Sequence, residues 1–163
     1  MIRSVAVVHR ARAEAWPRAT AVALIVIDTP GCAVAARPGP HALHLSFDTV
    51  AGELEAASLR LPQAASAVPF AVEHAHAVST FVAKLQHERE CIDLWVCESD
   101  GYSRSVTVAR WAAQRLGCPL HEPAPVAAVA PCALMGSVLR GVTGPVQPVT
   151  RRAVQVAEPE FQP

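Results

Sequence analysis

The sequence predicts an α/β domain in which a mostly parallel central sheet is flanked by helices. Residues 21–28 (AVALIVID) form an unbroken apolar run of strand length, typical of a central strand covered on both faces. Residues 70–88 repeat apolar side chains at helical spacing. Residues 91–117 pass from a short apolar strand that ends at Val96 through a polar turn into a second helix. Strands that alternate with helices favour a parallel sheet, and 163 residues suit a single domain.

The N-terminal half supplies the other expected strands. Residues 3–8 (RSVAVV) predict the first strand, and a short helical piece follows that Pro17 ends. Residues 43–48 alternate apolar and polar side chains, as in a half-buried strand that ends on an aspartate. Residues 49–69 place leucines among alanines and glutamates between prolines, which predicts a loop with a helical turn.

The C-terminal half is predicted to be mainly helical. The helix over residues 70–88 would turn its apolar face inward through Ala71, Ala75, Val78, Val82 and Leu85. The helix after the polar turn would end near Gly117, a good C-terminal capping residue. Prolines exclude a regular helix over residues 118–132, and residues 133–142 predict a short final one. The domain is therefore expected over residues 1–142, with a flexible, Pro-rich tail over residues 143–163.

The composition excludes several classes of partner. Basic and acidic side chains balance at 14 each, so nothing favours nucleic acid or an anionic membrane surface. The apolar run at residues 5–8 is too short for a signal segment or a membrane span. Five cysteines, an odd number with no C-x-x-C pair, favour reduced thiols in a cytoplasmic protein. The pairs His41/His44 and His74/His76 lack a further ligand at a persuasive spacing, so we expect no metal and no cofactor.

The junction between the strand and helix of residues 91–117 is the best candidate for a functional site. The start of a helix presents backbone N–H groups and a positive dipole end, and Arg104 adds a planar cation at the exit of the loop. This combination predicts a site for phosphate or sulfate. A Walker loop is excluded because the one lysine, Lys84, does not follow a glycine, and no G-x-G-x-x-G pattern occurs.

Residues 97–105 (CESDGYSRS) resemble the phosphate-binding loop of the cysteine-dependent protein tyrosine and dual-specificity phosphatases, whose motif is H-C-x-x-G-x-x-R-[ST] between a strand and a helix. The resemblance spans about residues 3–142 and is strongest in Gly-Tyr-Ser-Arg-Ser and the helix that follows. The surrounding segments are similar to those of small bacterial and phage members: VALIVIDTPG, HLSFDTV, FAVEHAHAVSTFVAKL and PCALMGSVLRGV. The resemblance implies the phosphatase fold and hydrolysis of phosphate monoesters through a cysteinyl-phosphate intermediate.

The resemblance also implies a role for each site residue. Cys97 would attack phosphorus, Arg104 would clamp the phosphate, Ser105 would assist departure of the thiolate, and Asp48 would protonate the leaving oxygen. From the residues alone, Asp48 reads rather as a polar or capping residue at a strand end. The phosphate-binding positions implied are Glu98, Ser99, Asp100, Gly101, Tyr102, Ser103 and Arg104.

The spacing departs from the family motif by one residue and leaves two alignments open. The family has five residues between Cys and Arg, whereas six separate Cys97 from Arg104. An ungapped alignment puts Glu98 at the nucleophile's position, where its charge would repel a phosphate dianion. An alignment with one inserted residue keeps Cys97 as the nucleophile in a wider loop. We favour the inserted alignment slightly, and both predict impaired catalysis.

Three functions follow as hypotheses. The first is a phosphatase-like protein that binds a phosphorylated small molecule or phosphoprotein at residues 97–105, with weak or lost hydrolysis; inorganic phosphate or sulfate would also occupy the loop. The second is a non-catalytic pseudophosphatase that captures phosphorylated ligands or acts as a scaffold. The third, which we rank lowest, is a sulfur-carrying Cys97 as in rhodanese-like proteins.

Overall fold

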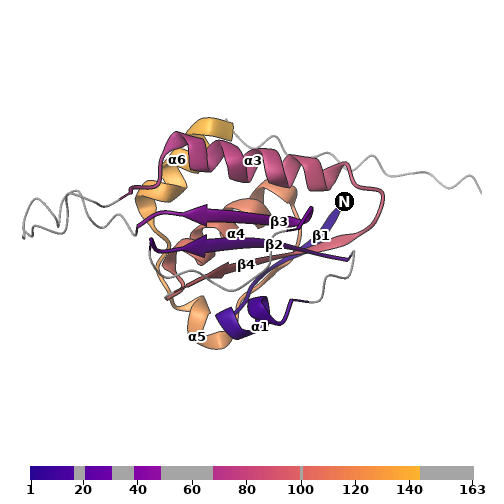
Figure 1. Cartoon of the computed structure of the whole chain (residues 1–163), viewed down its shortest axis with the longest axis horizontal. Coiled ribbons are helices and arrows are strands. Elements are labelled where there is room, and N and C mark those ends of the chain that lie inside the picture. Colours follow the sequence, from indigo (N-terminus) through magenta and orange to yellow (C-terminus); the bar gives the residue numbers. More distant parts are fainter. Residues whose placement is uncertain (17–20, 31–38, 49–67, 100, 144–163) are drawn as a thin grey trace, which may run out of the picture.

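The computed structural model describes residues 1–16, 21–30, 39–48, 68–99 and 101–143. In these residues five strands form one sheet in which every pair is parallel (Figure 1). The spatial order is β3-β2-β4-β1-β5. The strands are β1 (Ile2–Val7), β2 (Val22–Asp28), β3 (Ala42–Ser46), β4 (Ile92–Glu98) and β5 (Leu120–His121). The prediction of an α/β fold with a parallel sheet is confirmed.

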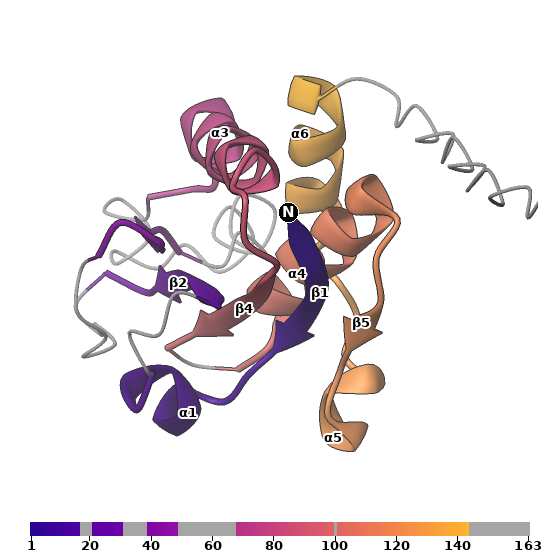
Figure 2. The same ribbon diagram turned by 90° about the vertical axis from the view of Figure 1, so that its right-hand side faces the viewer.

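Helices cover the two faces of the sheet unequally. One face carries α3 (Val72–Gln86), α4 (Ser103–Leu116) and α6 (Ala133–Thr143), whereas the short α1 (Arg10–Glu14) lies against the other (Figure 2). The chain steps from β1 to β2 in one direction along the sheet, and from β3 through β4 to β5 in the other. The neighbouring strands β2 and β4 therefore continue in opposite directions, to β3 and to β5. Loops at the carboxyl ends of two such neighbours are the usual ligand sites of open α/β sheets. The loop that follows β4 is in that position.

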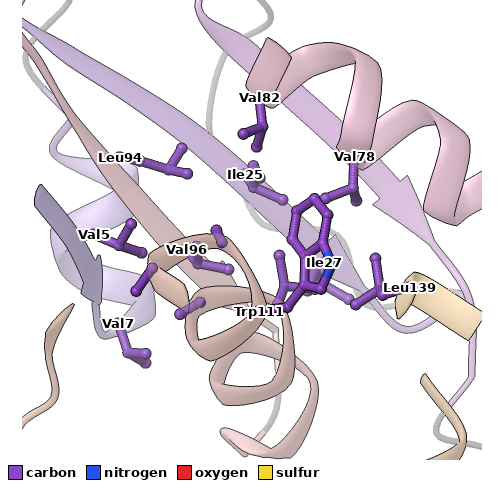
Figure 3. Close-up of a cluster of buried hydrophobic side chains, with 14 of the residues drawn as sticks. Val5, Val7, Ile25, Ile27, Val78, Val82, Leu94, Val96, Trp111 and Leu139 are labelled. Carbon is purple, nitrogen blue, oxygen red and sulfur yellow. The ribbon is translucent and has the colours of Figure 1, made fainter. Parts of the chain in front are cut away.

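The main core fills the space between the sheet and the three larger helices. Ile25, Ile27 and Val96 project from the central strands toward Trp111 of α4 and Leu139 of α6 (Figure 3). The inward face predicted for α3 is confirmed at Ala75, Val78, Val82 and Leu85, which are all buried. Burial of these apolar side chains is the main stabilising term, roughly 25 cal/mol per Å² removed from water.

A second, smaller core lies on the α1 face of the sheet. It contains Val8, Ala13, Leu24, Val26 and Cys97. The backbone register pairs Val26 with Cys97 and Ile27 with Glu98, and neighbouring residues in register point to the same face. Cys97 therefore belongs to the α1 face, and Glu98 to the face of α4.

Three details differ from the prediction. Strand β4 runs two residues beyond Val96 and ends at Glu98. The two-residue β5 was not predicted, because Pro119 and the short segment gave no strand pattern, yet it pairs with β1 at the sheet edge. The four-residue helix α5 (Ala124–Ala127) forms in the proline-rich segment where no regular helix was expected. Its proline lies within the first turn, where a missing N–H costs nothing.

The other expected elements are found close to their predicted bounds. Strands β1, β2 and β3 and helices α1, α3, α4 and α6 all form, and Gly117 ends α4 in the left-handed conformation with φ of 61°. The expected loop over residues 49–69 falls largely outside the described residues, as does nearly all of the expected tail over residues 143–163.

Candidate functional site

The candidate site forms where β4 passes into α4. Because β4 continues to Glu98, Cys97 and Glu98 are both strand residues and their side chains point to opposite faces of the sheet. Glu98 points toward the start of α4, and Cys97 points into the second core among Val8 and Val26. The alternation of a strand thus decides which of the two residues reaches the loop.

The thiol of Cys97 is buried in the second core, on the α1 face of the sheet. It is fully buried, and its Sγ lies 3.5 Å from the carbonyl oxygen of Glu98. Burial, with smaller contributions from Asp28, Glu98 and Glu14, raises the pKa of Cys97 to about 12. A catalytic thiol has its pKa lowered instead. Burial in the second core argues against Cys97 as the residue beneath the anion and against a sulfur-carrying role, and both roles stay predictions.

This placement predicts the alkylation pattern of the native protein. Iodoacetamide at mildly alkaline pH should modify the exposed Cys91 and leave Cys97 unmodified, because a buried thiol with a high pKa is neither accessible nor ionised. Peptide mass spectrometry would measure both sites. Alkylation in denaturant provides the control, since Cys97 should then react. Preferential reaction of Cys97 in the folded protein would contradict the placement.

Glu98 takes the place in the loop that the ungapped alignment assigns to the nucleophile. Its Oε2 accepts the backbone N–H of Ser105 at 2.6 Å, and its Oε1 lies 3.9 Å from Nε of Arg104. Ser105 is the third residue of α4, and no side-chain hydrogen bond comes from the N-cap residue Tyr102. Glu98 therefore satisfies a backbone donor that the helix itself cannot. Burial raises the pKa of Glu98 more than Ser105 and Arg104 lower it.

Arg104 is buried and holds the ends of neighbouring strands together. Its Nη1 donates to the carbonyl oxygen of Phe47 at 2.7 Å, and its Nη2 donates to Oγ1 of Thr29 at 2.9 Å. Phe47 follows β3 and Thr29 follows β2. The guanidinium predicted to clamp phosphate is thus engaged by protein groups on one side and faces Glu98 on the other.

The loop itself bends tightly over the Glu98 carboxylate. Gly101 has a φ of 81°, and a Cβ built on it would lie 3.2 Å from Oε1 of Glu98. Ser99 holds the beginning of the loop to β2, since its N–H donates to Ile27 and its Oγ accepts the N–H of Thr29 at 3.0 Å. Asp100, also predicted as a phosphate-binding residue, lies outside the described residues.

Gly101→Ala should lower the free energy of unfolding by about 1–2 kcal/mol. A left-handed backbone costs a residue with a side chain roughly 1–2 kcal/mol, and the added methyl group also crowds Glu98. Gly141→Ala is a matched control, because a Cβ there meets nothing within 4 Å and alanine favours the helix α6. Chemical denaturation would measure both variants. Equal stability of the two would show that the loop tolerates a side chain at position 101.

The remaining predicted residues at the start of α4 serve the helix and its neighbours. The hydroxyl of Ser105 donates to the carbonyl oxygen of Tyr102 at 3.0 Å, and the hydroxyl of Ser103 donates to Ala130 at 3.2 Å. Tyr102 packs partly buried against the main core. In this arrangement the hydroxyl of Ser105 is directed to the backbone, away from Cys97.

Asp48 is held by its own backbone contacts. Its Oδ2 accepts the N–H of Val68 at 2.7 Å, and its N–H donates to the carbonyl oxygen of Val68 at 2.7 Å. Asp48 and Val68, the described residues on either side of the range 49–67, are therefore bonded to each other. This contact agrees with a capping role at the strand end, and the role of general acid stays untested.

Two participants were not among the predicted site residues. Thr29 supplies a hydroxyl to Arg104, and Phe47 supplies a carbonyl oxygen. Thr29 follows a buried parallel strand, a position from which polar residues often reach a site, so that signal was present. A backbone carbonyl leaves no signal in a sequence.

Comparison with protein-family models, with curated proteins and with solved structures found no match to this chain. Within the described residues, no three His, Cys, Asp or Glu side chains are grouped so as to hold a metal ion. No helix in the same part of the chain has the length and apolar character needed to cross a membrane. The site must therefore be interpreted from its own geometry.

Proposed function

We propose that this chain is a phosphatase-like protein without thiol-dependent hydrolysis, a pseudophosphatase whose loop at residues 97–105 is an anion-binding module. The observation that carries the proposal is the carboxylate of Glu98, bonded to the Ser105 N–H beside Arg104, while Cys97 faces the opposite side of the sheet. The ligand class is a phosphate monoester on a small molecule or a protein.

The supporting chemistry is that of an anion cradle. A carboxylate and a phosphate monoester both present negatively charged oxygen acceptors to backbone N–H groups and a guanidinium. At the point where the strand becomes a helix, the N–H of Ser105 and the guanidinium of Arg104 already face such an acceptor, the carboxylate of Glu98. Hydrolysis would require in addition an ionised thiol in contact with phosphorus, and the thiol of Cys97 is neither ionised at neutral pH nor on that face.

An aryl phosphate tests the absence of hydrolysis. Pure protein incubated with p-nitrophenyl phosphate over a range of pH should release nitrophenol no faster than a heat-inactivated sample. Cys97→Ser should leave this background unchanged. Turnover by the wild type that Cys97→Ser abolishes would overturn the proposal and restore Cys97 as the nucleophile.

Calorimetry with phosphotyrosine tests the binding module. Binding should be specific for the phosphate group, so tyrosine should give no heat, and excess sulfate should compete with phosphotyrosine. A wild type that binds neither phosphotyrosine nor sulfate at any pH would overturn the assignment of an anion-binding loop and leave only the role of a scaffold.

A further inference from the structure

The Glu98 carboxylate is in a position suited to an external oxyanion. It accepts a helix N-terminal amide at 2.6 Å, and one of its oxygens is 3.9 Å from the guanidinium of Arg104. The side chains of Glu98 and Arg104 are only 2% and 1% exposed. Helix N-terminal amides and guanidinium groups are the donors that proteins use for phosphate and sulfate.

The backbone around the carboxylate is fixed independently of it. Ser99 is bonded to the ends of β2 through its N–H and its hydroxyl. Arg104 is bonded to Phe47 and Thr29, and Ser103 is bonded to Ala130. None of these contacts involves the carboxylate of Glu98, so they would persist if that side chain moved. The exposed Gly101, which has no side chain, forms the wall next to the carboxylate.

We infer that Glu98 is an internal and exchangeable ligand of this cradle, which excludes sulfate and phosphate monoesters while it is ionised and admits them once it is protonated. The inference rests on the proposed function, because it concerns the regulation of the same loop. Its consequence is that anion binding by the wild type takes up one proton.

The charged groups around Glu98 determine the direction of this effect. Arg104 faces the carboxylate from α4, and Asp28 at the end of β2 lies on the face of Cys97, where it raises the pKa of that thiol. Tyr102 is a titratable residue of the adjoining turn, and the acidic Asp100 of the same turn lies outside the described residues. Burial keeps the pKa of Glu98 above its ordinary value of 4.5. Protonation removes the negative charge and leaves the positive charge of Arg104 to attract an anion.

Sulfate is the suitable probe, because it keeps both charges from mildly acidic to neutral pH. Calorimetric titration of the wild type should show an affinity that increases as the pH falls, by up to about tenfold for each pH unit, the limit for uptake of one proton. Glu98→Gln imitates the protonated side chain in size and charge. It should bind sulfate at neutral pH as tightly as the acidified wild type does, with a flat pH profile.

A matched control and a second variant make the test decisive. Glu122 is also a glutamate bonded to an arginine, Arg110, at a distance from the loop in sequence, so Glu122→Gln should retain the wild-type profile. Glu98→Ala should show an increase in melting temperature with sulfate at neutral pH that exceeds the increase in the wild type. The melting temperature of Glu98→Ala tests the inference even if Glu98→Gln gives too little folded protein for calorimetry.

The opposite outcome is equally clear. If both Glu98 variants bind sulfate no more tightly than the wild type at neutral pH, Glu98 is a fixed helix cap and the inference is wrong. That result would leave the absence of hydrolysis intact. Conversely, hydrolysis through Cys97 would overturn the proposed function, whereas the sulfate profiles report on Glu98 without reference to turnover.

Discussion

Arg104→Ala should lower the free energy of unfolding by about 3–5 kcal/mol, the usual cost of removing one member of a buried ion pair. Two acceptors, the carbonyl oxygen of Phe47 and the hydroxyl of Thr29, lose their donor in the same step. Arg104→Lys should recover only part of the loss, because an ammonium group cannot match the planar set of donors. Urea denaturation at neutral pH would measure both variants.

The stability that Arg104→Ala loses should be smaller at acidic pH than at neutral pH. Without Arg104 the pKa of Glu98 rises further above its unfolded value, since Arg104 lowers it in the wild type. An acid whose folded pKa is raised destabilises the fold when it ionises, so stability falls as the pH increases from 4.5 through the folded pKa. Arg3→Ala is the control: the side chain of Arg3 is 62% exposed in its pair with Asp93, so its loss should change the stability very little. Equal losses for the two arginines would contradict the structural role of Arg104.

Glu98→Cys should create the reactive thiol that Cys97 is not. Five residues, Ser99 to Ser103, separate position 98 from Arg104, which is the spacing of the phosphatase motif. The new thiol would replace the carboxylate beside the Ser105 N–H and Arg104. These neighbours should hold its pKa below that of Cys97, against the burial that raises the pKa of Glu98 at the same position. The ultraviolet absorbance of the thiolate against pH would measure it.

Turnover provides the second measurement on this variant. Glu98→Cys should hydrolyse p-nitrophenyl phosphate above the wild-type background, and Glu98→Ser should not, because a hydroxyl at this position is not ionised. The double variant Cys97→Ser, Glu98→Cys is the matched control and should keep the activity. Activity that disappears with Cys97 would indicate the inserted alignment instead.

Much of the fold is predictable from the sequence, because the burial of a strand or of one helix face requires apolar residues at regular spacing. The apolar run of residues 21–28 and the helical spacing of residues 70–88 reflect environments that exist throughout β2 and α3. β5 escapes prediction because two residues at a sheet edge carry too little pattern. The resemblance to the phosphatase family and the activity it implies stay predictions.

The loop at residues 97–105 shows why a site is harder to predict than a core. The strand-to-helix junction and the position of Arg104 at the loop exit follow from local sequence. The burial of Arg104 does not, and the choice between Cys97 and Glu98 depends on where β4 ends. Ending the strand at Val96 left that choice open, and two more strand residues decide it by alternation. The contact of Arg104 with Phe47 joins residues 57 positions apart, which no local pattern encodes.

The bonds that Arg104 makes to Thr29 and Phe47 have a consequence for the dynamics of the loop. They connect the first turn of α4 to segments after two other strands, so the loop cannot open without disturbing the carboxyl edge of the sheet. The amide of Val106, which donates to the backbone carbonyl oxygen of Tyr102 in this turn, should therefore belong to the slowest class in hydrogen exchange, protected by sub-global unfolding rather than by local fraying. If the loop binds anions as proposed, its backbone would then be a rigid receptor in which only the side chain of Glu98 has to move.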